Sequence, residues 1–476
     1  MNVIHQYKSN GYNIVLDVNS GMIHVVDDLA YDIIAMYEEH DKDSILSAMV
    51  EKYSKPQYMS LITKRECCLE NFTDDVQSLV CQIKEAIDDV EQLKQDGALF
   101  TKDIYEDYIK DFKQRQTVVK ALCLHIAHDC NLACRYCFAE EGEYKGHREL
   151  MSYEVGKKAL DFLIQNSGSR RNLEVDFFGG EPLMNWQVVK DLVKYGREQE
   201  ELHNKKFRFT LTTNGVLLDD EVMEFANREM SNVVLSIDGR KEVNDRMRPS
   251  RNGKGSYELI LPKFQKLAES RNQTNYYVRG TFTHNNLDFS EDVKHLADLG
   301  FKQISVEPVV ALPEDSYAIT EENLPALYEE YDRLAKLMLE YKKEGKEFNF
   351  FHFMIDLSGG PCVAKRLSGC GSGTEYLAVT PWGDLYPCHQ FVGIPEFLMG
   401  NVEEGIVKPE LREEFKQCNV YSKDKCKDCF AKFYCSGGCA ANSYKFHEDL
   451  NDAYDIGCKL QRKRVECAIM LKAAEE

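Results

Sequence analysis

Residues 121–138 read Ala121-Leu-Cys-Leu-His-Ile-Ala-His-Asp-Cys130-Asn-Leu-Ala-Cys134-Arg-Tyr-Cys137-Phe138. The apolar start of this segment predicts a strand, and the loop after it carries three cysteines in the spacing Cys-x3-Cys-x2-Cys. Three thiolates on one loop can hold three irons of a cubane cluster and leave the fourth iron open to an external ligand. A zinc loop is the alternative, although zinc loops favour Cys-x2-Cys pairs that close to four ligands. We therefore predict an open iron–sulfur cluster at Cys130, Cys134 and Cys137.

Apolar runs alternate with helical periodicity after this first strand. The further predicted strands are 173–178, 207–211, 233–237, 276–282 and 303–306. The predicted helices are 153–165, 187–203, 220–230, 256–270, 289–299, 321–346 and a closing helix at 459–474. Six strand-then-helix units predict an α/β fold with parallel strands, either an open barrel or a doubly wound sheet. Such folds bind their ligands at the C-terminal ends of the strands.

Composition narrows the class of protein. The chain has 476 residues and a net charge of −20, so it is long enough for two or three domains. An acidic chain gains no counterion-release energy from a phosphate backbone, which argues against a nucleic-acid partner. No run of 18 apolar residues and no signal sequence is visible. We therefore expect a cytoplasmic protein without a membrane partner.

The 17 cysteines are unevenly distributed. Seven lie between Cys67 and Cys137, and ten lie between Cys362 and Cys467. Because cytosolic thiols stay reduced, clustered cysteines indicate metal or cluster ligation rather than disulfides.

Polar motifs stand at the ends of the next three predicted strands. Gly179-Gly180-Glu181-Pro182 follows the second strand, Thr212-Thr213-Asn214-Gly215 ends the third, and Ser236-Ile237-Asp238-Gly239 ends the fourth. Glycines let a backbone approach a ligand closely, while the other residues supply hydroxyl, amide and carboxyl groups. These motifs, the cluster loop and the aromatic Tyr136 before its last cysteine together resemble the radical S-adenosylmethionine (SAM) superfamily.

This resemblance implies that SAM binds the open iron and is cleaved to a 5′-deoxyadenosyl radical, which makes Cys130, Cys134 and Cys137 the catalytic ligands. It implies that Glu181 accepts a hydrogen bond from the SAM ammonium and that Arg248 pairs with the SAM carboxylate. The other cofactor contacts that it implies are Tyr136, Phe138, Gly179, Gly180, Pro182, Thr213, Asn214, Ser236 and Asp238.

Three residues near these motifs have a second interpretation. Thr213 fits turn chemistry equally well. Arg279 and Glu307 are weaker cofactor candidates, because a structural salt bridge at the strand ends explains them as well as a ligand contact does.

The C-terminal cysteines form a second pattern: Cys370, then Gly383-x4-Cys388, then Cys426-x2-Cys429-x5-Cys435-x3-Cys439, then Cys458. A soft thiolate set of this size suits iron–sulfur clusters or zinc. The order resembles the SPASM extension of peptide-modifying radical SAM enzymes. That resemblance implies two auxiliary [4Fe–4S] clusters, a distal one on Cys426, Cys429, Cys435 and Cys458 and a proximal one on Cys370, Cys388 and Cys439.

Three points about this tail stay open. The fourth ligand of the proximal cluster is either Cys362 or a thiolate of the substrate. A zinc-stapled tail is the alternative to auxiliary clusters, since metal staples commonly order irregular loops. The role of Cys418 is undecided.

The first 95 residues predict two strands joined at Asn19-Ser-Gly21 and helices at 29–39, 44–53 and 73–94. This compact, winged-helix-like unit resembles the precursor-recognition domain of peptide maturation enzymes, a unit of three strands and helices whose exposed edge binds a leader peptide as an extra strand. A plain structural domain is the alternative.

We predict four parts: a peptide-recognition domain at 1–95, a linker or bridging helix at 96–117, a partial (β/α)6 radical SAM barrel at 118–346, and a Cys-rich SPASM domain at 347–476. The whole chain most resembles the maturases of six-cysteine (SCIFF) peptides. That resemblance implies thioether bonds between cysteine sulfur and an α-carbon, a Cys-rich precursor peptide with a leader, and a reductant such as flavodoxin or ferredoxin.

Three other functions are alternatives to this one. A sulfatase-maturing dehydrogenase would use the same cofactors, but the N-terminal unit argues against it. A non-enzymatic iron–sulfur electron carrier would explain the cysteines but not the motifs at the strand ends. A zinc-stabilised peptide-binding module is the third option.

Overall fold

The computed structural model describes residues 3–55, 57–58, 75–109, 114–146, 148–355 and 367–475. Cys67, Cys68, Cys362 and the predicted helix start at Thr73 lie outside these ranges. No helix within them is long and apolar enough to cross a membrane.

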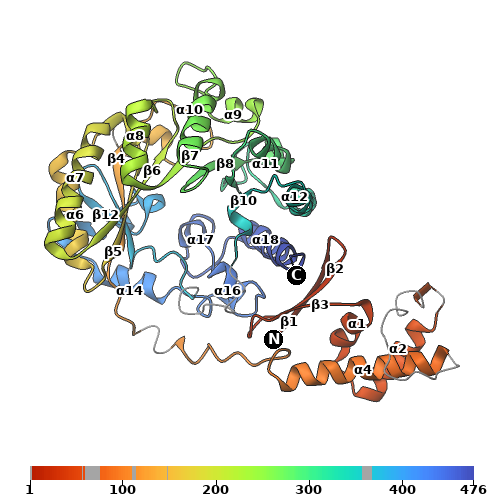
Figure 1. Ribbon diagram of the computed structural model, residues 1–476. Coiled ribbons are helices and arrows are strands. Elements are labelled where there is room, and N and C mark those ends of the chain that lie inside the picture. The colour runs from red at the N-terminus through yellow and green to blue at the C-terminus, as the bar shows by residue number, and fades with distance from the viewer. Residues whose placement is uncertain are drawn as a thin grey trace.

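The largest element is an eleven-stranded sheet in the order β10-β9-β8-β7-β6-β5-β4-β11-β12-β13-β14. Its parallel strands are β4 (Ala121–Ala127), β5 (Asn172–Gly179), β6 (Lys206–Thr213), β7 (Met230–Ser236), β8 (Tyr276–Phe282) and β9 (Gln303–Pro308). The connecting helices are α6 (Tyr153–Asn166), α7 (Trp186–His203), α8 (Asp220–Glu229), α9 (Lys241–Met247), α10 (Tyr257–Ser270), α11 (Phe289–Asp298) and α12 (Leu324–Lys343). Figure 1 shows these helices along the outer side of the curved sheet. The six predicted strand–helix units are confirmed.

The two faces of these strands differ in burial. Successive side chains of a strand point to opposite faces. Phe177 and Phe209 are fully buried in the large core beneath the helices. Their strand neighbours Asp176 and Thr210 stay partly accessible, as does Arg279. We call this partly accessible, polar side of β5–β9 the inner face; it is available to a ligand.

Five short strands extend the sheet beyond the predicted six. The strands are β10 (Asn349–Phe350), β11 (Tyr376–Val379), β12 (Asp384–Tyr386), β13 (Gly400–Asn401) and β14 (Gly405–Ile406). β11 runs parallel to β4, and β12 to β14 follow it in antiparallel order. Such short segments show no readable periodicity, so the sequence did not predict them. The strands β11 to β14 join the C-terminal region to β4, the strand that precedes the cluster loop, whereas β10 pairs with β9 at the other edge of the sheet.

The N-terminal unit has its own sheet and core. β1 (Ile4–Ser9), β2 (Tyr12–Asp17) and β3 (Ile23–Val26) form an antiparallel sheet in the order β1-β2-β3. Its helices are α1 (Asp28–Met36), α2 (Lys42–Tyr53) and α4 (Asp75–Gln95), which share a separate hydrophobic core with the sheet. The β2–β3 hairpin agrees with the sequence pattern, whereas β1 was implied only by the resemblance.

The C-terminal region is as irregular as its composition predicts. Its helices are α14 (Pro409–Gln417), α15 (Asp424–Lys427), α16 (Lys432–Cys435), α17 (Ala440–His447) and the closing helix α18 (Asp455–Ala473). Part of it packs around a small core of Leu367, Val420, Cys426, Phe433 and Ala453.

The predicted linker is attached to this small core. Asp103 forms an ion pair of 2.7 Å with Lys432, and the two side chains are only 10 % and 5 % exposed. The Tyr421 hydroxyl also donates to Asp103, at 2.9 Å. The Tyr105 ring packs edge-on against Phe433, with 5.3 Å between centroids. This segment is therefore a packed part of the C-terminal region.

Candidate active site

The three cysteines of the loop after β4 lie together. Cys130, Cys134 and Cys137 are all partly accessible. The pKa of the Cys130 thiol is raised to about 12, mainly by burial and in part by the nearby Glu181 carboxylate and the other two thiols. The three sulfurs are therefore near enough to repel one another as thiolates. Iron would reverse this repulsion, because a bound cation favours the thiolate form.

Asp129 fixes the start of this loop. Its carboxylate accepts the backbone N–H of Cys130 at 2.9 Å. It also forms an ion pair with Arg251 and lies 3.6 Å from Nε of Arg148. Asp129 was not predicted as a site residue, although an acidic residue directly before the first cysteine is a visible signal in the sequence. Its arginine partners come from distant parts of the chain and gave no such signal.

The two glycines after β5 let that strand end contact the cluster loop. A Cβ on Gly180 would lie 2.1 Å from the carbonyl oxygen of Asp129, and one on Gly179 would lie 2.4 Å from that of Ala127. The Gly180 N–H donates to the Ala127 carbonyl at 2.7 Å. Any side chain here would push the loop away. The glycines thus serve backbone contact with the cluster loop, where the sequence suggested contact with the ligand.

Glu181 is fully buried and ties two motifs together. Its carboxylate accepts from the Thr213 hydroxyl at 2.8 Å, from the Asn214 N–H at 2.8 Å and from the Leu183 N–H at 3.0 Å. Burial raises the pKa of Glu181, and these hydrogen bonds oppose the shift. A carboxylate has about four lone-pair sites, so a ligand ammonium can still be accepted. Thr213 also accepts from the Gly215 N–H at 3.0 Å, as turn chemistry predicts.

Asn214 connects β6 to the cluster loop. Its side-chain amide donates to Asn131 Oδ1 at 2.7 Å and lies 3.5 Å from the Cys130 sulfur. The structure therefore brings this predicted cofactor residue directly beside a predicted cluster ligand.

Tyr136, Asp238 and Arg248 form a buried chain of hydrogen bonds. The Tyr136 hydroxyl donates to Asp238 at 2.8 Å and accepts from Nη1 of Arg248 at 2.9 Å. Burial raises the pKa of Asp238 to about 6, although Arg248 and Tyr136 oppose it. Nε of Arg248 is buried and has no hydrogen-bond partner among the described residues. An unsatisfied buried donor is costly, so this guanidinium fits an anionic ligand such as the SAM carboxylate.

The remaining predicted cofactor residues lie around this chain. Ser236 ends β7 and is partly accessible. Pro182 is buried at the start of the short helix Pro182–Asn185. Phe138 is 48 % exposed, and its ring lies 5.6 Å from that of His389 in the C-terminal region.

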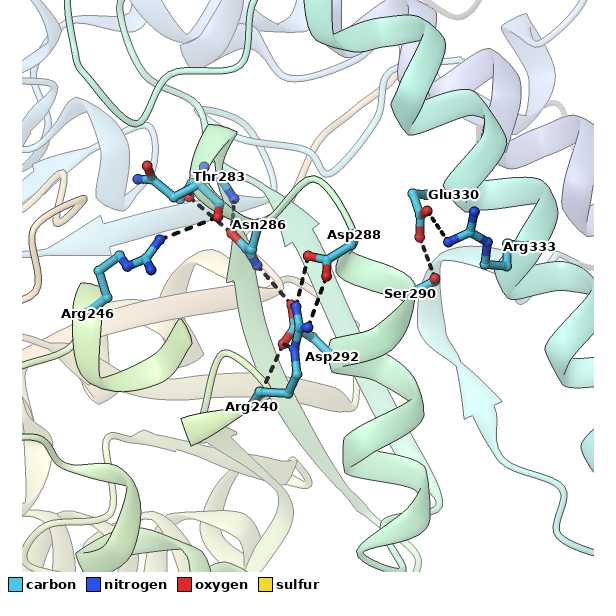
Figure 2. Close-up of polar contacts among 10 residues, drawn as sticks. Arg240, Arg246, Thr283, Asn286, Asp288, Ser290, Asp292, Glu330 and Arg333 are labelled. Atoms are coloured by element: carbon cyan, nitrogen blue, oxygen red, sulfur yellow. Dashed lines mark hydrogen bonds and ion pairs between the residues drawn. The ribbon is translucent and has the colours of Figure 1, made fainter. Parts of the chain in front are cut away.

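An arginine held by two aspartates fixes the turn after β7, as Figure 2 shows. Arg240 Nε donates to Asp292 at 2.8 Å, and its Nη atoms reach Asp288 at 2.8 and 2.9 Å. Asp292 is fully buried and also accepts from Asn286 at 3.0 Å. A Cβ on Gly239 would lie 2.3 Å from Asp292. The sequence did not predict this clamp, which positions the turn that carries Asp238.

Arg279 and Glu307 form the salt bridge that was one of their two interpretations. Nε and Nη2 of Arg279 donate to the two carboxylate oxygens of Glu307, each at 3.2 Å.

The thiols of the C-terminal region fall into two groups. Burial raises the pKa of Cys388, with Cys439 and Cys370 as the neighbouring thiols that add to the shift. Burial likewise raises the pKa of Cys426 to about 12, and the thiols that add to it are Cys458, Cys435 and Cys429. The tertiary structure therefore places these thiols near one another in two groups. That they bind clusters stays a prediction.

Among the described residues, no three His, Cys, Asp or Glu side chains converge closely enough to hold one metal ion. The thiolates of a cubane bind different irons, so they need not converge on one point. Cys418 is buried, and its thiol lies 3.6 Å from the Glu414 carbonyl oxygen at the end of α14.

Comparison with known proteins agrees with this geometry. Residues 124–299 match the Radical SAM superfamily. This matched part of the chain includes the cluster loop and the motifs after β5, β6 and β7. The match implies SAM and one [4Fe–4S] cluster as cofactors.

Relatives of known name belong to peptide- and sulfatase-maturing groups. The chain is 28% identical over 362 residues to the serine-type anaerobic sulfatase-maturating enzyme of Bacteroides thetaiotaomicron, covering 69% of this chain and 84% of that protein. It is 27% identical over 341 residues to the antilisterial bacteriocin subtilosin biosynthesis protein AlbA of Bacillus subtilis, covering 68% of each. Among solved structures, Streptococcus suis SuiB bound to its precursor peptide SuiA matches with a TM-score of 0.53 at 15% identity, covering 96% of this chain and 99% of that one. This last likeness shows the fold alone.

Proposed function

We propose that the protein is a radical SAM enzyme that matures a ribosomally made, Cys-rich peptide by joining cysteine sulfur to an α-carbon. The observation that carries the proposal is the presence of two further thiol groups in addition to the three-cysteine loop. The first group is Cys370, Cys388 and Cys439, and the second is Cys426, Cys429, Cys435 and Cys458. Relatives that act in bacteriocin biosynthesis support a peptide substrate.

The cofactors and the chain have separate tasks in this proposal. When bound, SAM and three [4Fe–4S] clusters would supply the hydrogen-abstracting radical and accept the surplus electron. The chain's own residues hold and orient them. Arg248 would pair its unsatisfied Nε with the SAM carboxylate, Glu181 would accept from the ammonium, and Asp238 would keep Tyr136 and Arg248 in place.

The peptide chemistry balances without an acid–base pair of the protein. For each bridge, the α-carbon loses a hydrogen atom, and the cysteine thiol loses a proton and an electron. The sulfur–carbon bond forms, and the peptide becomes lighter by two hydrogens.

The strand β3 is one of the two edge strands of the described N-terminal sheet and is a candidate site for the leader of such a peptide. At the β1 edge, the Tyr7 hydroxyl donates to the backbone carbonyl of Glu466 in α18 at 2.8 Å, and His5 stacks on Phe430 with centroids 3.5 Å apart. On β3, Val25 is 48 % exposed. We propose that a leader segment adds to β3 as a fourth strand.

The test is anaerobic co-expression with small Cys-rich peptides encoded beside the gene. Mass spectrometry should show a loss of two hydrogens per bridge, and fragmentation should place the linkage between a sulfur and an α-carbon. No bridged peptide from any of these partners would contradict the proposal. Val25→Asp should reduce modification while sparing SAM cleavage, whereas Leu202→Asp, on a still more exposed apolar residue of α7 (73 %), should leave modification unchanged.

A sulfatase-maturing type of dehydrogenase is the second candidate, and the 28% identity to such an enzyme favours it. Oxidation of a serine hydroxyl to an aldehyde also removes two hydrogens, so mass alone does not separate the two. Counting free thiols and aldehydes does. Bridge formation consumes thiols without aldehydes, and the dehydrogenase reaction yields aldehydes without bridges.

A further inference from the structure

The Arg279–Glu307 pair lies on the inner face, beside the candidate SAM site. In the sheet register, Arg279 is the partner of Ser236 on β7, and Thr281 is the partner of Glu307 on β9. The Thr281 N–H donates to Asp238 at 3.1 Å. The pair is therefore directly next to the residues expected to hold SAM, one and two strands further from the cluster loop.

The C-terminal region reaches the cluster-loop end of the sheet. His389 directly follows Cys388, a cysteine of the first thiol group. Its ring lies 5.6 Å from that of Phe138 in the cluster loop and 5.1 Å from that of Phe178 on β5. The C-terminal region therefore approaches the candidate SAM site, beside which the Arg279–Glu307 pair stands.

Glu307 is held from behind. His352 lies 3.8 Å from its carboxylate, and the same ring contacts the Ser305 hydroxyl at 3.2 Å and Nη1 of Arg464 in α18 at 3.1 Å. Burial would raise the pKa of Glu307, but Arg279, His352 and Arg464 outweigh it and lower the pKa to about 2. The carboxylate therefore stays charged and keeps its arginine in a fixed position.

Arg279 keeps donors for a ligand. Its bonds to Glu307 use Nε and Nη2, which leaves Nη1 without a bond in the described structure. The Arg279 and Glu307 side chains are 46 % and 34 % exposed although they stand on interior strands. Because the guanidinium is planar and pre-organised, little freedom is lost when it makes one more hydrogen bond.

We infer that Arg279 contacts the peptide substrate and donates from Nη1 to a backbone carbonyl beside the α-carbon that loses its hydrogen. This inference rests on the function proposed above. The charge of Arg279 is already balanced by Glu307, so the pair favours a neutral amide acceptor over the SAM carboxylate. Arg248, whose buried Nε has no partner among the described residues, is the better match for that carboxylate.

The test compares Arg279→Gln with the wild type and with Arg208→Gln. The control removes an arginine that also forms an ion pair across neighbouring strands, with Glu174 at 3.7 Å, but at the opposite ends of those strands. The probe is the Cys-rich peptide modified in co-expression. The measurements are equilibrium SAM binding, 5′-deoxyadenosine formed, and bridged peptide formed per 5′-deoxyadenosine.

We expect Arg279→Gln to bind SAM as the wild type does but to form about tenfold less bridged peptide per 5′-deoxyadenosine, since a misplaced α-carbon leaves the radical uncoupled. Arg279→Lys keeps the positive charge but lacks the planar guanidinium with its fixed donors. It should recover only part of the yield of bridged peptide per 5′-deoxyadenosine. The Arg208→Gln control should match the wild type.

Two results would overturn the inference. Unchanged coupling in Arg279→Gln would show that the residue does not position the peptide. A tenfold loss of SAM affinity would make it a cofactor ligand instead. Absence of bridged peptide in the wild type would refute the proposed function itself, which separates the two failures.

Discussion

The loop Cys130–Cys137 and the loop Cys426–Cys435 each contain three cysteines but are held in different ways. The first is pinned by the rest of the barrel. The Ala133 N–H donates to the Pro249 carbonyl at 2.8 Å, the Arg135 N–H to the Met247 carbonyl at 2.9 Å, and Asp129 anchors its start. The second consists of two single-turn helices, α15 and α16, next to a core of five buried side chains.

The difference teaches where a bound cluster contributes to folding. A loop supported by packed strands keeps its shape without metal, whereas a loop beside a small core depends on the staple. We therefore expect loss of cluster ligands to remove chemistry from the first loop and structure from the second. The predictions below test this contrast in order of decreasing effect.

Replacing Cys130, Cys134 and Cys137 together by alanine should abolish SAM cleavage, because no open iron is left for SAM to bind. The anaerobic protein should retain about eight of the twelve irons that three cubanes require, and limited proteolysis should reveal no new cleavage at 130–137. Iron content, 5′-deoxyadenosine and protease fragments are measured together. Residual SAM cleavage would mean that the catalytic ligands are wrongly assigned.

Cys426→Ala should instead affect the structure of the second loop. Removal of this ligand should release the distal cluster, about four irons, and the segment 418–458 should become protease-sensitive because its small core cannot hold it alone. The matched control is Cys467→Ala, another buried cysteine, in α18, which should keep all iron. A distal loop that stays protected without iron would break the contrast between the two loops.

Asp103→Asn tests the same difference between the two loops without removing a predicted cluster ligand. It leaves Lys432 nearly buried without its ion-pair partner, a loss of about 3 kcal/mol for a buried pair. We expect partial protease sensitivity in the distal loop and full iron content. Lys120→Gln, which breaks a more exposed pair with Glu375 (30 % and 33 % exposed), should change little, since exposed ion pairs contribute about 1 kcal/mol or less.

The barrel site should show a modest dependence on pH. The pKa of Asp238 is raised to about 6, so below pH 6 the folded protein carries this group protonated. Protonation weakens its acceptance from Tyr136 and with it the position of Arg248. If SAM binds the ionised form, its apparent affinity falls by up to about tenfold per pH unit below 6 and is constant above 7. Binding to Asp238→Asn across pH 5–8 should lack this step; an identical step in the variant would assign it to another group.

The barrel shows how much local pattern can predict. All six central strands and six of the connecting helices were predicted to within a few residues, because each has a clear apolar run or helical period. The short helix α9 was not predicted. The three-cysteine loop and the motifs after β5 to β7 were found for the same reason, since each lies within a few residues of a strand end. The short strands β10 to β14 were not predicted, because two to four residues are too few to show a hydrophobic periodicity.

Ion-pair partners that lie far apart along the chain were not predicted either. Arg240 was unremarkable in the sequence, and its two aspartates lie 48 and 52 residues further along the chain. Arg251 lies 122 residues from Asp129. A spacing rule cannot find such pairs, because loop conformation and packing decide which charged groups meet.

The sequence by itself determined the parallel α/β arrangement and the spacing of its first three thiols, since both follow from neighbours along one strand or loop. Only the tertiary structure decided that the segment around Asp103 packs against the small core that contains Cys426, and that the Arg279–Glu307 pair stands beside Asp238. These relations join residues separated by tens to hundreds of positions, and they exist only once the strands have stacked and the C-terminal region has folded across the inner face.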